Sequence, residues 1–274
     1  MRLQSHTYKP RFVPRQDSGD FPHDLLFGFE TEMSIWKIDA DSTEETINTL
    51  IKDTEKFFYI KYDGSIDGGS TGAEINSHPF NWDYILNHRD YLVKLTDLKH
   101  IHGDRSGKFL GSNAQQFRIN RSCGFHIHIS KDYFSEMHLK NIVRFFYNNP
   151  DFISNISQRP GTESLRRFAR PTLKKGKTVE DFLSESQLWS DPSYRYTSLN
   201  ISGDKTIEIR IFQGTLNIDC IMAYLEFALA VVIFTGNVKS NKINVKNFMQ
   251  YINENNDNFG NFIKLYNGEI SWKE

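Results

Sequence analysis

Two glutamates occupy alternate positions in the apolar stretch FGFETEM, residues 27–33. Alternate side chains of a β-strand point to the same face, so a strand here would place Glu30 and Glu32 on one face and the aromatic residues on the other. A buried carboxylate is costly unless a partner compensates its charge. A lone pair of glutamates also fits a solvent-facing strand, so its chemistry depends on what the rest of the chain supplies.

Two further stretches repeat this alternation with other polar residues. The stretch CGFHIHIS places His126 and His128 opposite an apolar face, and TIEIRIFQ places Glu208 and Arg210 opposite three isoleucines. If the three strands lie in one sheet with their apolar faces on the same side, the polar side chains converge on the other. Taken singly, the motifs also fit surface charges, hydrogen-bonded sheet histidines and an ion pair within the sheet.

Convergence of these groups would give a metal and phosphate site. Clustered carboxylates raise one another's pKa unless a cation compensates them. Oxygen ligands with one imidazole favour Mg²⁺ or Mn²⁺ over structural zinc. A guanidinium beside them suits phosphate oxygens that such a metal bridges.

A glycine-rich segment supplies more acid. The stretch KYDGSIDGGSTGAEINSHP contains Asp63, Asp67 and Glu74, with a turn followed by a short strand. The DGS motif alone is typical of an ordinary turn. Either aspartate could join Glu74 and the glutamates of FGFETEM.

The pattern of apolar residues predicts an α+β fold with a mainly antiparallel sheet, because strands and helices interleave without a regular βα alternation. Helical periodicity predicts amphipathic helices at residues 43–58, 82–99 and 135–148. Strands are predicted at residues 25–37, 58–62, 73–77, 115–119, 124–130, 195–201 and 206–212. The apolar run 217–236 contains Asp219 and Glu226, which favour a buried helix over a membrane span.

The chain has 274 residues, of which 38% are hydrophobic, and we predict a single domain over residues 1–274 with an irregular arm at 1–24. Residues 159–195 form a predicted lid excursion with one short helix near 178–186. This excursion either closes over phosphates or an acidic substrate, or is a solvated loop. Its basic residues are Arg159, Arg166, Arg167, Arg170, Lys174, Lys175 and Lys177.

Overall charge excludes a strongly basic or acidic protein. The 33 Lys and Arg residues nearly balance the 34 Asp and Glu residues, so we expect neither nucleic acid nor a membrane as a partner. The two cysteines, Cys123 and Cys220, are too few for a disulfide framework. Because the N-terminal stretch has no apolar signal region, we expect a cytoplasmic protein. The oligomeric state is left open.

Five motifs in order resemble the amidoligase family, whose relatives include glutamine synthetase and glutamate–cysteine ligase. They are FGFETE, DGS with a following GAEINS, CGFHIHI, RYTSLNI and IEIRIFQGTL, and they span about residues 26–230. The resemblance implies a curved antiparallel sheet like the glutamine synthetase catalytic domain, with helices on one face and an active-site funnel on the other. It also implies ATP, two or three Mg²⁺ or Mn²⁺ ions, and amide formation through an acyl phosphate.

The resemblance also implies roles for individual residues. Glu30, His126 and Glu208 resemble the ligands of a metal between the β- and γ-phosphates. Glu32 and Glu74, with Asp63 or Asp67, resemble the ligands of a metal on the acyl-phosphate side. Arg210 resembles a phosphate clamp. The cofactor-binding set is therefore predicted to be His128, Arg210, Lys61 and Asn200, and the catalytic set Arg210, Glu208 and Glu32.

The substrates are the open part of this prediction. The adenylate-site and ammonium-site signatures of glutamine synthetase are not evident in the chain, so we expect a carboxylate and an amine, with an amino acid or peptide as one option. Two other functions are weighed. One is a metal-dependent hydrolase that acts without nucleotide. The other is a non-catalytic relative that kept the fold to bind a ligand.

Overall fold

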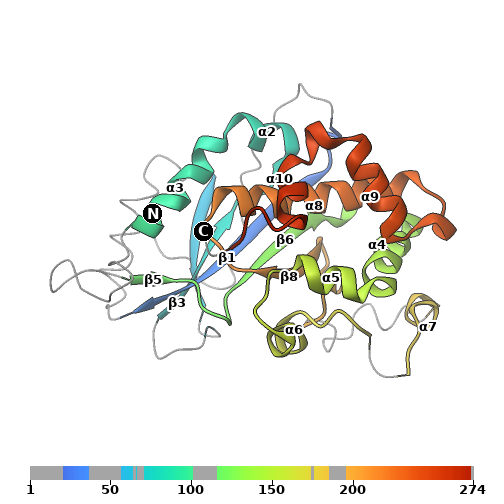
Figure 1. Cartoon of the computed structure of the whole chain (residues 1–274), viewed down its shortest axis with the longest axis horizontal. Coiled ribbons are helices and arrows are strands. Elements are labelled where there is room, and N and C mark those ends of the chain that lie inside the picture. The colour runs from blue at the N-terminus through green and yellow to red at the C-terminus, as the bar shows by residue number, and fades with distance from the viewer. Residues whose placement is uncertain are drawn as a thin grey trace. The chain divides into compact units, whose positions relative to one another are not determined.

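The computed structural model describes residues 21–36, 57–63, 66, 71–100, 116–173, 176–184 and 196–272. They form an α+β fold with helices and an open, mainly antiparallel sheet, as predicted. The chain divides into two compact units, Met1–Phe125 with Gly214–Ile218, and His126–Gln213 with Asp219–Glu274. Figure 1 shows the elements of both in chain order. The single domain stays a prediction.

Strand β1 (Leu26–Trp36) is the centre of the first unit's strands. It pairs antiparallel with β3 (Thr71–Ser77), and β3 pairs antiparallel with β2 (Phe58–Tyr62). The short strands β4 (Phe80–Asn81) and β5 (Gln116–Arg118) also pair antiparallel with β1. All the strands predicted in this part of the chain are confirmed, and β4 is additional.

Aromatic residues build the core of the first unit. Phe27, Phe29 and Met33 are buried, which confirms the apolar face predicted for β1. The Phe29 ring stacks on Phe125 with ring centroids 5.1 Å apart and meets Phe58 edge-on at 6.0 Å. Such pairs add to the burial of apolar area, which holds the strand in place.

Helices α2 (Trp82–Asn87) and α3 (Arg89–His100) replace the single helix predicted at 82–99. The break lies at His88, where side chains compete for the backbone. The Asn87 amide donates to the Asp83 carbonyl at 2.8 Å, and a His88 ring nitrogen lies 2.8 Å from the Tyr84 carbonyl. Such local bonds favour a helix end over its continuation. The predicted arm 1–24 and helix 43–58 lie almost wholly outside the described residues, although Phe58 begins β2.

The second unit contains most of β6 (Gly124–Ser130) and has the strand order β6-β8-β7. Strand β8 (Thr206–Gln213) pairs antiparallel with the two-residue β7 (Leu199–Asn200). Strand β7 is shorter than the predicted 195–201. The three isoleucines of β8 are fully buried, as their alternation predicted.

Seven helices are described in the second unit. Helices α4, α7 and α8 match the predictions at 135–148, 178–186 and 217–236, whereas α6 is a second helix in the excursion, where one was predicted. The helices are α4 (Glu136–Asn148), α5 (Pro150–Ile156), α6 (Thr162–Phe168), α7 (Val179–Ser184), α8 (Ile218–Asn237), α9 (Val245–Glu254) and α10 (Gly260–Tyr266).

Helix α8 forms the core of this unit. It is the one helix within the described ranges that is long and apolar enough to span a membrane, yet 83% of its most apolar window is buried. Its Phe227 ring lies 6.0 Å from Phe248 of α9 and 5.4 Å from Phe262 of α10, and Figure 1 shows these helices together in orange and red. Buried Glu226 accepts a hydrogen bond from the Phe262 N–H at 2.9 Å, which satisfies a charge that a bilayer would leave costly.

Candidate functional site

Three buried carboxylates meet in the first unit. Glu32 of β1, Glu74 of β3 and Asp63, which directly follows β2, have oxygens that all lie within 4.8 Å of one another. Strand register explains the arrangement, because Glu74 lies opposite Glu32 on one side and opposite Lys61 on the other. Directly opposed residues share a face of the sheet. Of the two candidate aspartates the structure therefore brings Asp63 into this carboxylate cluster, while Asp67 lies outside the described residues.

A glycine lets Asp63 reach the cluster. The Asp63 N–H donates to the Gly72 carbonyl at 3.0 Å. A Cβ atom at Gly72 would lie 2.1 Å from the Asp63 carbonyl oxygen, a separation that no side chain can adopt without moving the backbone. The GGSTGAE segment therefore needs a glycine at this position for close approach of the two backbones.

The cluster is electrostatically strained without a cation. Burial, together with the charges of Glu30, Asp63 and Glu32, raises the pKa of Glu74 to about 8, although the charge of Lys61 acts in the opposite direction. The Lys61 ammonium lies 3.7 Å from a Glu30 oxygen, so part of its positive charge compensates the Glu30 carboxylate. Three closely spaced carboxylates are the donors that Mg²⁺ and Mn²⁺ prefer, and a divalent ion would replace the proton that Glu74 otherwise holds. The residues present fit such an ion.

The backbone of Gly124 orients one of the carboxylates. Its N–H donates to Oε2 of Glu32 at 2.6 Å in a buried hydrogen bond. Gly124 was not predicted as a site residue, and its one signal in the sequence is its position directly before the alternating FHIHI. A charge-assisted bond of this kind fixes the Glu32 side chain toward the cluster.

A second set of polar side chains, the Glu208 cluster, lies in the second unit. Oε2 of Glu208 accepts a hydrogen bond from the Asn200 amide at 2.9 Å, and Oε1 is bound by the Arg210 guanidinium. The His126 Nδ1 atom lies 3.5 Å from Oε1. Register again explains the pairing, because Asn200 is opposite Glu208 on neighbouring strands. Four residues predicted from three separate motifs are thus brought together.

Neighbouring groups hold this cluster in place. The Asn200 side-chain oxygen accepts from the Ser202 N–H at 3.0 Å and from its hydroxyl at 2.6 Å, which fixes the amide so that it donates to Glu208. Nδ1 of His128 lies 3.5 Å from the Thr206 hydroxyl. The Arg210 guanidinium lies 5.9 Å from the centre of the Tyr196 ring, within range of a cation–π contact.

Arg159 is buried, although its sequence context suggested an exposed basic residue of the excursion. It donates to the carbonyl of Ile211 at 3.1 Å and to that of Arg210 at 3.2 Å. Arg159 therefore anchors the beginning of the excursion to the backbone of β8. Nothing in the sequence distinguishes it from the surrounding basic residues.

One predicted metal site has ligands in both units. The metal predicted to bind Glu30, His126 and Glu208 would take ligands from both units, and it stays a prediction. So do the nucleotide contacts assigned to Lys61, His128 and Asn200.

Comparison with known families matches part of the chain. Residues 112–232 match the model of a family described as "Putative amidoligase enzyme". The chain contains an amidoligase-family region. This region is shorter than the predicted span of about 26–230 and covers a little under half of the chain; it includes the Glu208 cluster but none of the three buried carboxylates. A comparison with curated proteins gave no match. The amidoligase match indicates a ligase-type enzyme.

Proposed function

We propose that the protein is an ATP-dependent carboxylate–amine ligase that forms an amide through an acyl phosphate. The observation that carries the proposal is the Glu208 cluster, in which one carboxylate is held by Asn200 and Arg210 beside His126, inside the amidoligase-family region. The buried carboxylates of Glu32, Asp63 and Glu74 support it independently, because they lie outside that region.

The proposal assigns divalent ions, Mg²⁺ or Mn²⁺, to these residues. Glu32, Asp63 and Glu74 would hold one ion, and Glu30, His126 and Glu208 are proposed for another. When bound, such ions supply positive charge against phosphate oxygens. The chain's own contribution is to keep the carboxylates oriented, as Gly124 does for Glu32 through its backbone N–H.

The proposed reaction needs no side-chain nucleophile. A carboxylate oxygen of the substrate forms a bond to the γ-phosphorus of ATP, the bond from that phosphorus to the β–γ bridging oxygen breaks, and ADP leaves. The amine nitrogen then attacks the acyl carbon, phosphate leaves with the original carboxylate oxygen, and the nitrogen loses a proton to give the amide. Arg210 is proposed to stabilise charge on the γ-phosphoryl oxygens, with Glu208 and Tyr196 holding its guanidinium. Cys123 and Cys220 are buried, which fits chemistry without a thiolate.

The proposal extends to the setting of the enzyme. It includes the curved sheet and funnel of the glutamine synthetase catalytic type, a single working domain, and action in the cytoplasm. The burial of helix α8 supports the proposal that this segment does not span a membrane.

Release of ADP tests the proposal. Pairs of carboxylates and amines are incubated with the protein, ATP and Mg²⁺, and ADP and amide are measured. A ligase releases one ADP per amide and needs both substrates. A hydrolase would form product without ATP, and a binding module would release no ADP; either result contradicts the proposal. Glu208→Gln should abolish the release, whereas Glu136→Gln, at a solvent-exposed glutamate on α4, provides the matched control.

A further inference from the structure

The second unit contains a pocket of about 960 Å³, to which no sequence motif assigned a role. Residues of α4, α5, α6 and the stretch that leads into α7 line it. A pocket of this volume is at the upper end of the range that holds drug-sized organic molecules. It is far larger than ammonia needs, so its size favours a substrate with an extended body.

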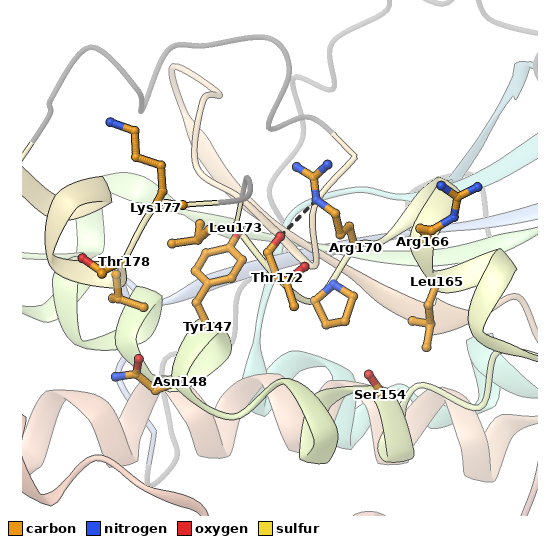
Figure 2. A pocket seen from close by; sticks show the side chains of 13 residues that line it. Tyr147, Asn148, Ser154, Leu165, Arg166, Arg170, Thr172, Leu173, Lys177 and Thr178 are labelled. Carbon is orange, nitrogen blue, oxygen red and sulfur yellow. Dashed lines mark hydrogen bonds between the residues drawn. The ribbon is translucent and has the colours of Figure 1, made fainter.

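One edge of the pocket is positively charged. Among the described residues, the lining includes Arg166, Arg170 and Lys177 and no acidic residue. Figure 2 shows the charged ends of these three side chains on one side of the view, with Asn148 and Ser154 on the opposite side. A carboxylate is the matching group for such an edge, because guanidinium and ammonium groups bind it through charge-assisted hydrogen bonds.

The three cations differ in how much of their charge is already compensated. Arg166 forms a two-point ion pair with Glu163, at 2.9 and 3.0 Å, and Lys177 lies near enough to Asp181 to help lower that residue's pKa. The Nε atom of Arg170 donates to the carbonyl of Thr172 at 3.0 Å, which is an uncharged partner. Arg170 is therefore the cation best suited to an incoming anion, with Lys177 second.

The remaining lining combines apolar surface with the uncharged polar side chains of Asn148, Ser154, Thr172 and Thr178. Leu165, Pro171, Leu173 and Val179 contribute aliphatic surface, and the Tyr147 ring adds an aromatic wall. An apolar lining with few placed polar groups is the usual composition of a site for a small organic ligand. The pocket thus suits a molecule with an apolar body and one anionic end.

The pocket adjoins the Glu208 cluster through the backbone before β8. The Arg170 N–H donates to the Tyr196 carbonyl and the Ser198 N–H donates to the Arg170 carbonyl, both at 2.9 Å. The Tyr196 ring in turn lies 5.9 Å from the Arg210 guanidinium. The Tyr147 hydroxyl donates at 2.8 Å to the carbonyl of Leu199, the residue before Asn200. Residues that line the pocket therefore contact the same short stretch as the residues of the cluster.

We propose that this pocket binds the distal, carboxylate-bearing end of the non-nucleotide substrate. The carboxylate pairs with Arg170 and Lys177, and the apolar body lies against Leu165 and Leu173. The assignment to a ligase substrate rests on the proposed function, whereas the binding of a carboxylate with an apolar body does not.

Binding of a matched pair of probes, hexanoate and hexanamide, tests the pocket without ATP. The two differ in charge but hardly in shape, and their dissociation constants are measured by NMR titration at low ionic strength. Wild-type protein should bind hexanoate at least about tenfold more tightly, the difference expected for one charge-assisted bond. Arg170→Gln and Lys177→Gln should each reduce that preference. Arg167→Gln, an exposed arginine of α6 outside the lining, should keep it.

The possible outcomes separate the explanations. Equal affinity for the two probes overturns the proposal, as does an equal loss of preference in Arg167→Gln, which would indicate diffuse charge. Displacement of hexanoate by inorganic phosphate or ATP at lower concentration would assign the pocket to phosphate instead. Thermal unfolding checks each variant, and Lys177→Gln carries the test if Arg170→Gln does not fold, because Lys177 is exposed.

Kinetics link the pocket to the reaction. With a productive substrate pair, Arg170→Gln should raise the KM for the substrate whose distal carboxylate binds in the pocket about tenfold. The KM for ATP should stay unchanged. An equal rise in both would contradict the assignment. Preferential binding of hexanoate in a protein that releases no ADP would keep the pocket and refute the ligase, so the two failures are distinguishable.

Discussion

Replacement of Glu74 by glutamine should remove a large pH dependence of the metal-free protein's stability. The pKa of Glu74 is raised from 4.5 to about 8 by burial and by the neighbouring carboxylates. A raised pKa means that the folded protein holds the proton more tightly than the unfolded chain. The stabilisation is full below pH 4.5 and is lost as pH rises toward 8. At about 1.4 kcal/mol per pH unit, wild type should lose roughly 3 to 4 kcal/mol of unfolding free energy between pH 5 and pH 8.

Urea denaturation in EDTA, followed by tryptophan fluorescence from pH 5 to pH 8, measures this loss. Glu74→Gln should show a much flatter dependence because the amide does not titrate, while Glu136→Gln, exposed on α4, should follow wild type. Adding Mg²⁺ or Mn²⁺ should stabilise wild type more at pH 8 than at pH 5, because the ion and the proton compensate the same charge. A constant difference between wild type and Glu74→Gln across this range would refute the reasoning.

Three more outcomes follow from the site. ATP should bind only with a divalent ion, and equal affinity in EDTA and in Mg²⁺ by calorimetry would contradict the account. Arg210→Ala and Glu208→Ala should each lower turnover by orders of magnitude with the fold intact by circular dichroism, while Cys123→Ser should leave the chemical step largely unchanged; the reverse pattern would point to a thiol mechanism. Gly72→Ala should displace Asp63 and weaken Mn²⁺ binding by about tenfold or more, on the scale of a lost ligand or its support. An unchanged Mn²⁺ affinity by calorimetry would show that Gly72 is not needed for the metal site.

The alternating strands could be predicted because each carries a complete apolar face. FGFETEM, FHIHI and IEIRI leave one register that buries every aromatic or aliphatic residue, and a slip of one residue would expose them all. The structure confirms these strands and the burial of their apolar faces.

The partners of the carboxylates could be predicted only as a set. Glu32 lies opposite Glu74 because two segments about forty residues apart pair in one register, and nothing local in either segment specifies that register. Asp63 and Asp67 look equivalent in the sequence. Asp63 reaches the cluster through the close approach of its backbone to Gly72, which is a tertiary contact.

Residues with identical local patterns can also differ in burial. Arg159 and Arg166 both belong to a basic stretch, yet Arg159 is buried against the carbonyls of β8 while Arg166 is exposed and paired with Glu163. The difference depends on the backbone carbonyl groups of β8 that accept hydrogen bonds from Arg159. Hydrophobic periodicity carries no information about such contacts with another element. For the same reason, the hydrogen bond from the Gly124 N–H to Glu32 is not predictable from the sequence.

Transfer of oxygen from substrate to phosphate tests the central claim most directly. With a productive pair from the ADP screen, the carboxylate substrate is labelled with ¹⁸O and the released phosphate is analysed by mass spectrometry. The account predicts one ¹⁸O atom in the phosphate for each amide formed, because the carboxylate oxygen bonded to phosphorus leaves with it. Amide formation with unlabelled phosphate would contradict activation as an acyl phosphate.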